Sequence, residues 1–164
     1  GGIDCLSVRE IANKCNCSTQ PIYLSFSGID EIRNEVIKKA IAVYDKYIAN
    51  EIKSGKYSEY KAVGMGYIRF AKEEKQLFKM LLMRDGSFKK AWGEESFDNA
   101  TLMIMKNYGL YKDESLKLHT EMWIFVHGIA VMYATEYLDW EWETVSEMVT
   151  DAFLGFTGKK GEKK

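Results

Sequence analysis

The chain has 164 residues, of which 46% are hydrophobic and 29% are charged, and this balance excludes an intrinsically disordered protein. Its formal net charge of −1 provides no general positive field for nucleic acid, so DNA binding would need a local surface. One proline and 13 glycines leave few helix breakers, and the periodic segments are rich in good helix formers. We therefore expect an all-α fold.

Two short helices joined by a turn are predicted near the start of the chain. Ser7 and Glu10 have the spacing of a capping box, which begins a helix. Asn16 tolerates the left-handed conformation that ends one. Ser18 is the expected N-cap of the second helix, and Pro21 falls in its first turn. The pattern predicts a helix-turn-helix, although an ordinary helical hairpin in a bundle has the same pattern.

The residues of this stretch also resemble a family motif. The motif is roughly T-x-x-x-I-A, a turn, V-S-x-x-x-(L/I)-Y-x-x-F, a small residue and K-x-x-L. The matching residues are Ser7, Ile11, Ala12, Cys17, Ser18, Ile22, Tyr23, Phe26 and Ile32. This stretch resembles the DNA-binding half of the tetracycline-repressor (TetR) family. Ile29 stands where the family usually has lysine, and Asn16 where it commonly has glycine.

The resemblance implies a set of DNA contacts. Tyr23 would contact a backbone phosphate, while Thr19, Gln20 and Leu24 would face the groove. The DNA-binding residues expected from the resemblance are Ser7, Ser18, Thr19, Gln20, Pro21, Tyr23 and Leu24. The first helix of the family's domain would precede residue 1, so we expect the given chain to lack it.

The remaining segments predict a helical bundle. Helices are expected at 29–53, 57–74, 75–83, 88–107, from Asp113 to about 138, and at 142–156. We assign residues 1–48 to a helix-turn-helix DNA-binding domain, 49–158 to a ligand-binding and dimerisation domain, and 159–164 to a Lys-rich tail.

The last two predicted helices carry apolar stripes. In the resembled family these helices pair with their copies, which implies a homodimer, although a terminal helix can also dock on its own core. The expected dimer interface consists of Met122, Val126, Ile129, Tyr133, Tyr137, Val145, Met148, Val149, Ala152, Phe153 and Phe156.

Methionine and aromatic residues crowd the middle helices. Core packing explains each of them, but flexible methionines and flat aromatic rings also suit a pocket for a small apolar effector. The candidate pocket residues are Met65, Phe70, Phe97, Met103, Trp123 and His127. "WIFVHG", from Trp123 to Gly128, resembles a run common in the effector domains of the family, and His127 within it also fits a core histidine.

These features favour a ligand-responsive transcriptional regulator, most simply a repressor, that binds a near-palindromic double-stranded DNA operator as a dimer. No Glu-x-x-His pair, glycine-rich phosphate loop or nucleophile signature points to an enzyme, so no catalytic residue, metal or cofactor is expected. The clustered cysteines, at 5, 15 and 17, are expected as small core residues. The alternative is a helical ligand-binding or interaction module that has lost DNA binding, which Ile29 and a neutral N-terminal part favour.

The longest apolar run, from Trp123 to Ala134, is too short to cross a bilayer, and no signal peptide is visible. A cytoplasmic protein without a membrane partner is therefore expected.

Overall fold

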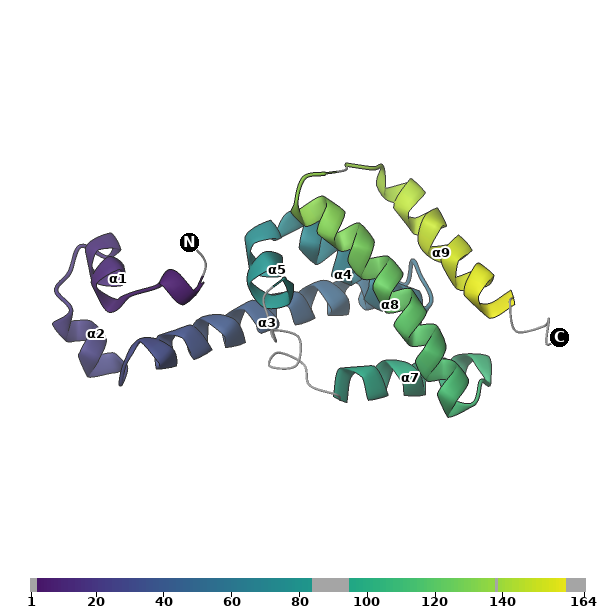
Figure 1. Cartoon of the computed structure of the whole chain (residues 1–164), viewed down its shortest axis with the longest axis horizontal. Helices are drawn as coiled ribbons and strands as arrows, with labels where there is room; N and C mark the ends of the chain where they lie inside the picture. The colour runs from purple at the N-terminus through teal and green to yellow at the C-terminus, as the bar shows by residue number, and fades with distance from the viewer. Residues whose placement is uncertain (1–2, 84–94, 138, 159–164) are drawn as a thin grey trace. The chain divides into compact units, whose positions relative to one another are not determined.

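The structure is a computed structural model that describes residues 3–83, 95–137 and 139–158, and every regular element in these ranges is helical (Figure 1). This confirms the expected all-α fold. A short 3-10 turn at Ile3–Cys5 precedes α1 (Val8–Lys14), α2 (Gln20–Ser25), α3 (Ile29–Ser54), α4 (Glu59–Glu73), α5 (Lys75–Leu82), α7 (Glu95–Tyr108), α8 (Lys112–Ala134) and α9 (Trp142–Gly158).

The chain divides into two compact units, Gly1–Val43 and Tyr44–Lys164, and the division falls inside α3. The expected boundary after residue 48 also falls inside this helix. The predicted Lys-rich tail at 159–164 lies outside the described residues, as does the first part of the helix predicted at 88–107.

In the first unit, α1 begins where the capping box predicts. The Ser7 N–H donates to Glu10 Oε2 (3.2 Å), and the Glu10 N–H donates to Ser7 Oγ (3.2 Å). The N-cap of α2 is Thr19 instead of Ser18, because Thr19 directly precedes the first helical residue, and no side chain caps this helix. Pro21 lies in the first turn of α2, as predicted.

The turn after α1 is a Schellman motif. Asn16 has a positive φ of 50°. Its N–H donates to Asn13 O (3.2 Å), and the N–H of Cys17 donates to Ala12 O (3.0 Å), so two carbonyls at the end of the helix are satisfied. Asparagine is one of the few residues besides glycine that adopt this conformation readily, which explains how Asn16 stands at a position where glycine is common.

The cysteines are not core residues, and this prediction was wrong. Cys5, Cys15 and Cys17 are all exposed. Val8 and Ala12 form the buried stripe of α1, but the helix ends at Lys14 and the stripe does not continue to Cys15.

One arginine of α3 forms hydrogen bonds to the residues at the start of the first unit. The Arg33 guanidinium donates to the backbone oxygens of Ile3 (3.2 Å), Asp4 (2.8 Å) and Leu6 (3.1 Å). It also pairs with the Asp30 carboxylate (2.9 Å). The Arg33 side chain therefore joins three residues before α1 to α3.

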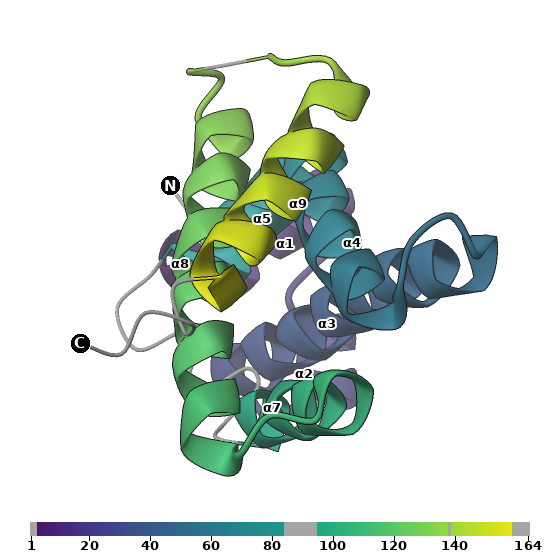
Figure 2. The same ribbon diagram turned by 90° about the vertical axis from the view of Figure 1, so that its right-hand side faces the viewer.

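The second unit is a bundle around α4 and α8. These two helices pack against each other, and α9 lies across both of them (Figure 2). α5 and α7 also contact both helices. Most of α4 is buried, as expected for an inner helix; its buried residues are Tyr60, Ala62, Met65, Gly66, Tyr67, Ile68, Phe70 and Ala71.

The start and end of α8 differ from the prediction. The N-cap is Tyr111, and Asp113 lies within the first turn. The helix ends at Ala134 because Glu136 has a φ of 60° and the Tyr137 N–H donates to Met132 O (2.9 Å), which closes a second Schellman motif. The expected end near 138 was therefore too late.

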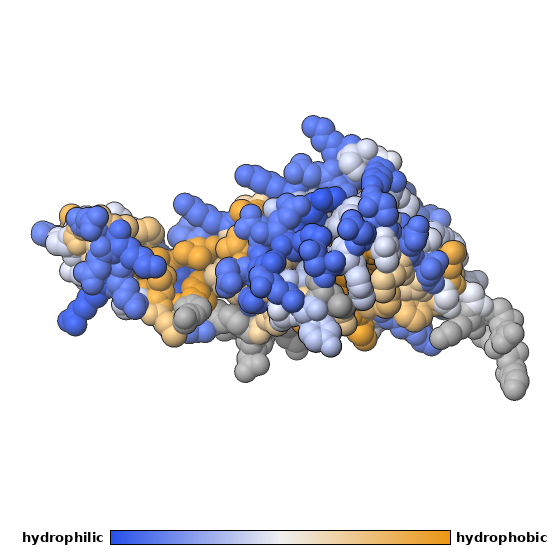
Figure 3. All heavy atoms as spheres, turned by 90° about the horizontal axis from the view of Figure 1, so that it is seen from above, coloured by the Kyte–Doolittle hydropathy of each residue, from blue (hydrophilic) through white to orange (hydrophobic). Residues whose placement is uncertain are grey.

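On the face of the molecule in Figure 3, hydrophilic residues cover most of the second unit, with smaller apolar patches between them. Among the helices of the described residues, none is long and apolar enough to cross a membrane.

Candidate functional site

α2, the second helix of the predicted helix-turn-helix, lies at the surface along its whole length. None of its residues is buried. Tyr23 is 60% exposed and Leu24 is 82% exposed, so both are accessible to a partner. Gln20 is also exposed.

The other predicted DNA-binding residues differ in accessibility. Ser18 and Pro21 are exposed, whereas Thr19 and Ser7 are half-buried. The Ser7 hydroxyl also donates to Glu10 Oε2 (3.0 Å), so this side chain is already used by the capping box. The strongest candidates for DNA contacts are therefore on α2 itself.

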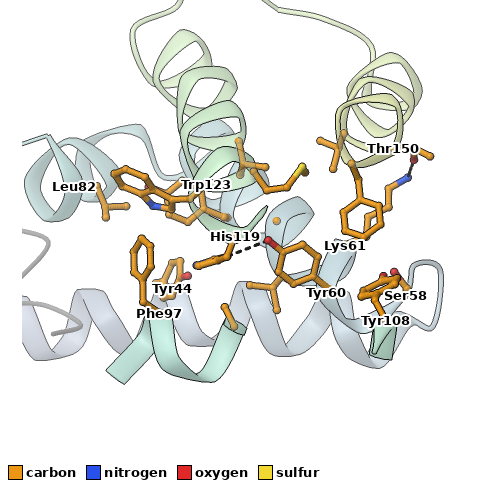
Figure 4. A pocket seen from close by; sticks show the side chains of 18 residues that line it. Tyr44, Ser58, Tyr60, Lys61, Leu82, Phe97, Tyr108, His119, Trp123 and Thr150 are labelled. Carbon is orange, nitrogen blue, oxygen red and sulfur yellow. Dashed lines mark hydrogen bonds between the residues drawn. The ribbon is translucent and has the colours of Figure 1, made fainter. Parts of the chain in front are cut away.

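The second unit encloses a largely apolar cavity of about 230 Å³ (Figure 4). An apolar cavity of about 150 Å³ is enough to bind benzene, so this one has room for a small organic ligand. Its walls come from α4, α7, α8 and α9, with one residue each from α3 and α5 and with Ser58 from the loop before α4. The ring-bearing residues that line it are Tyr44, Tyr60, Tyr67, Phe97, Tyr108, His119, Trp123 and Phe153.

Two of the predicted pocket residues, Phe97 and Trp123, line this cavity. Met65 and Phe70 are fully buried in the core and do not line it, so for them the core-packing interpretation holds. Met103 does not line it either. The ring of His127 stacks on that of Trp123, with 5.2 Å between the centroids, but His127 is not a lining residue.

Two tyrosine–histidine pairs join α4 to α8 beside the cavity. The Tyr60 hydroxyl lies 3.0 Å from His119 Nδ1, and the Tyr67 hydroxyl lies 2.7 Å from His127 Nδ1. Burial raises the pKa of both tyrosines and lowers the pKa of both histidines. At neutral pH each tyrosine is therefore protonated and each histidine uncharged, so both pairs are hydrogen bonds between neutral groups.

Acid is expected to destabilise the fold through His119. Burial lowers its pKa in the folded chain from 6.5 to about 4. Below pH 6.5 the histidine is protonated in the unfolded chain but stays neutral in the folded chain, and this difference favours unfolding. The contribution of His119 to the free energy of unfolding is therefore complete above pH 6.5 and is lost as the pH falls through about 4. We expect a loss of about 2 kcal/mol from this group.

The measurement is urea unfolding at a series of pH values, with His119→Gln as the control. Glutamine can still form a hydrogen bond with the Tyr60 hydroxyl but does not titrate. The variant should show a shallower loss of stability in this window, and equal slopes in the two proteins would contradict the assignment.

One lysine reaches the cavity from the N-terminal end of α4. The Lys61 amino group donates to Ser146 Oγ (2.8 Å) and to Thr150 Oγ1 (2.7 Å), both on α9. Burial lowers the pKa of Lys61. Within the part of the chain that the structure describes, Lys61 forms no ion pair with a carboxylate.

The predicted dimer stripe is only partly accessible in a single chain. Most of it is interior to a single chain, because it packs α8 and α9 against α4; the buried members are Met122, Val126, Ile129, Tyr133, Val145 and Val149. Met148, Ala152, Phe153 and Phe156 are half-buried, and Tyr137 is exposed. Ile124 and Leu154, which the prediction omitted, are exposed large apolar residues on the faces of α8 and α9 opposite these stripes, and Leu116 of α8 is exposed as well.

Several cavity residues belong to the predicted dimer stripe and not to the predicted pocket. Met122, Val126, Val149 and Phe153 line the cavity. Their helical spacing indicated a buried face, but not which neighbour buries it. Among the described residues, no cluster of three or more His, Cys, Asp or Glu side chains has the arrangement of a metal site.

Comparison with known proteins found no family model, no curated protein and no solved structure that matches the chain. The resemblance to the TetR family stays a prediction from the sequence motif.

Proposed function

We propose that the chain is a ligand-responsive transcriptional regulator that binds double-stranded DNA through its helix-turn-helix. The observation that supports this most is that α2 buries none of its residues while it presents Tyr23 and Leu24 to solvent. A hairpin that served only to build a bundle would place such residues in the core. Gln20, in the first turn of α2, is exposed and can form hydrogen bonds to a base edge.

The cavity of the second unit supplies the proposed effector site. It is enclosed largely by apolar and aromatic side chains with a few polar groups, which is the usual composition of a small-molecule site. A ligand that prefers one conformation of the chain by about 1–3 kcal/mol would change DNA occupancy by about five- to 150-fold. The simplest consequence is a cytoplasmic repressor that its effector releases from DNA.

The proposed regulator is a homodimer that reads a near-palindromic site. A self-associating surface on α8 and α9 would use their outward faces, where Ile124 and Leu154 are exposed, because the buried stripes are already occupied within the chain. Light scattering on the chain with and without selected DNA measures the stoichiometry. A single chain bound to a single half-site would contradict this part of the proposal.

The direct test is selection of bound duplexes from a random library, followed by two variants of α2. Gln20→Ala should relax the preference at one base position by about 1–3 kcal/mol. Tyr23→Phe removes a hydroxyl that would reach a phosphate, so it should weaken binding by about 1 kcal/mol on all sequences alike.

Asp151→Asn, at an exposed position of α9, is the matched control and should leave both affinity and preference unchanged. If the selection yields no enriched sequence, DNA reading by α2 is wrong. A chain that binds small molecules but no DNA would instead match the alternative of a ligand-binding module.

A further inference from the structure

The two ends of the cavity differ in chemistry. Figure 4 shows Lys61 and Thr150 at one end, while Trp123, Phe97 and Leu82 surround the other. Tyr60 and Tyr108 lie on the Lys61 side as well, so the two ends differ mainly in that the amino group and the hydroxyl of Thr150 are at only one of them. A ligand that fills the whole cavity would need a polar head and an apolar body.

Lys61 determines the sign of the polar head. Of the described residues that line the cavity, only Lys61 carries a formal charge at neutral pH, because burial keeps His119 neutral. The two groups that accept from its amino group are neutral hydroxyls, on Ser146 and Thr150. The amino group also lies 4.8 Å from the centre of the Tyr57 ring and is attracted by the Glu147 carboxylate, but neither is a direct ion pair, and two of its three N–H donors are used by the hydroxyls. One donor and most of the positive charge are left for an anion.

An anion at this end would offset that charge. A hydrogen bond between ionised partners is about twice as strong as one between neutral partners, and partial burial of the amino group strengthens it further. Lys61 has a single compact charge, which suits one carboxylate better than a larger polyanion.

The volume limits the body of the ligand. The cavity of about 230 Å³ exceeds the roughly 150 Å³ that holds benzene, so it has room for one ring and a short chain but not for a large polycyclic molecule. The rings of Phe97, Trp123 and His119 meet each other at centroid distances of 4.7 Å (Phe97–His119) and 5.9 Å (Phe97–Trp123) and form an aromatic wall for such a ring.

We propose that the effector is a small aromatic monocarboxylate whose carboxylate pairs with Lys61 and whose ring lies against Phe97 and Trp123. This assignment rests on the proposed function, since it names the ligand class of the same cavity. It can nevertheless be tested separately, because it requires a binding measurement without DNA.

The experiment is calorimetric titration of the full chain at pH 7 with 3-phenylpropanoate and with its neutral amide, 3-phenylpropanamide. The carboxylate should bind at least about tenfold more tightly than the amide. In Lys61→Met, which keeps the length of the side chain, the carboxylate should lose about tenfold in affinity while the amide stays within about twofold. Lys61→Arg should restore most of the preference.

Lys56→Met is the matched control. Lys56 is a nearby lysine that pairs with Glu143 (3.8 Å), does not line the cavity and acts on Lys61 only through charge repulsion, so its loss should keep both affinities within about twofold. Equal binding of the two probes, no binding of either, or an equal loss in Lys56→Met would overturn the assignment. Selection of bound DNA without ligand tests the DNA reading independently, so failure of one proposal can be told from failure of the other.

Discussion

Replacing Arg69 with methionine is expected to lower the free energy of unfolding by about 3 kcal/mol. Arg69 Nε donates to the Glu51 carboxylate, and the Glu51 side chain is only 8% exposed. Without the guanidinium, that carboxylate would stay buried with no opposite charge beside it. Because Arg69 itself is 35% exposed, we place the effect at the low end of the range for broken buried pairs.

Arg69 also connects further parts of the second unit. Its guanidinium lies over the ring of Trp142 at 4.2 Å and within 3.5 Å of the Glu73 carboxylate. α3, α4 and α9 therefore meet at one side chain. Methionine keeps much of the apolar contact with Trp142. The expected loss of unfolding free energy therefore comes mainly from the Glu51 carboxylate, which would be buried without a positive partner.

The double variant Glu51→Leu with Arg69→Met separates charge from packing. It replaces the pair by two apolar side chains and should recover stability to within about 1 kcal/mol of the unmodified chain. Chemical denaturation of the single and double variants gives the coupling energy. A double variant no more stable than Arg69→Met alone would show that the unpaired Glu51 carboxylate does not cause the loss of stability.

The second large effect is expected at a glycine of α4. A Cβ at Gly66 would lie 3.0 Å from Ile48 Cα and 3.1 Å from Tyr47 O, which are backbone atoms of α3. The two helices would have to separate, so Gly66→Ala should destabilise the chain by about 3 kcal/mol.

Gly64, in the same helix, provides the control. A Cβ there would meet only the Val126 side chain at 3.5 Å, which is ordinary contact. Gly64→Ala should therefore stabilise the chain by about 0.5–1 kcal/mol through helix propensity. Thermal unfolding of the two variants should give shifts of opposite sign, and shifts of equal sign would rule out a close backbone approach at Gly66.

Local signals in the sequence predicted much of the fold. The spacing of Ser7 and Glu10 located the start of α1, and Asn16 located its end. Ser54-Gly55 correctly predicted the end of α3, where Gly55 has a φ of 65°. These predictions succeeded because caps and left-handed residues act within a few positions of the chain.

The surface against which each apolar helix face packs was harder to predict. The periodic stripe through Val126 and Val149 showed that one face of each helix is buried, but a stripe has the same period whether it packs on its own chain or on a second copy. The structure buries both residues within the chain. The TetR resemblance therefore directed attention to an interface where the residues themselves fit an interior.

The polar part of the cavity had no local signature at all. Lys61 meets Ser146 and Thr150 only through folding, and the same is true of Tyr60 and His119. An isolated lysine at the start of a helix resembles any solvated surface charge in a sequence. Lys61 is placed at the cavity only because α9 packs beside α4.

The exposed thiols of Cys5, Cys15 and Cys17 have a practical consequence. They are the only cysteines in the chain, and all belong to the first unit. A maleimide dye added to the unmodified chain would therefore label this unit alone, with two attachment points flanking the turn that leads into α2. The unmodified chain can thus be labelled with a fluorophore beside the surface proposed to bind DNA. Ligand binding in the second unit can be measured without a label in that unit.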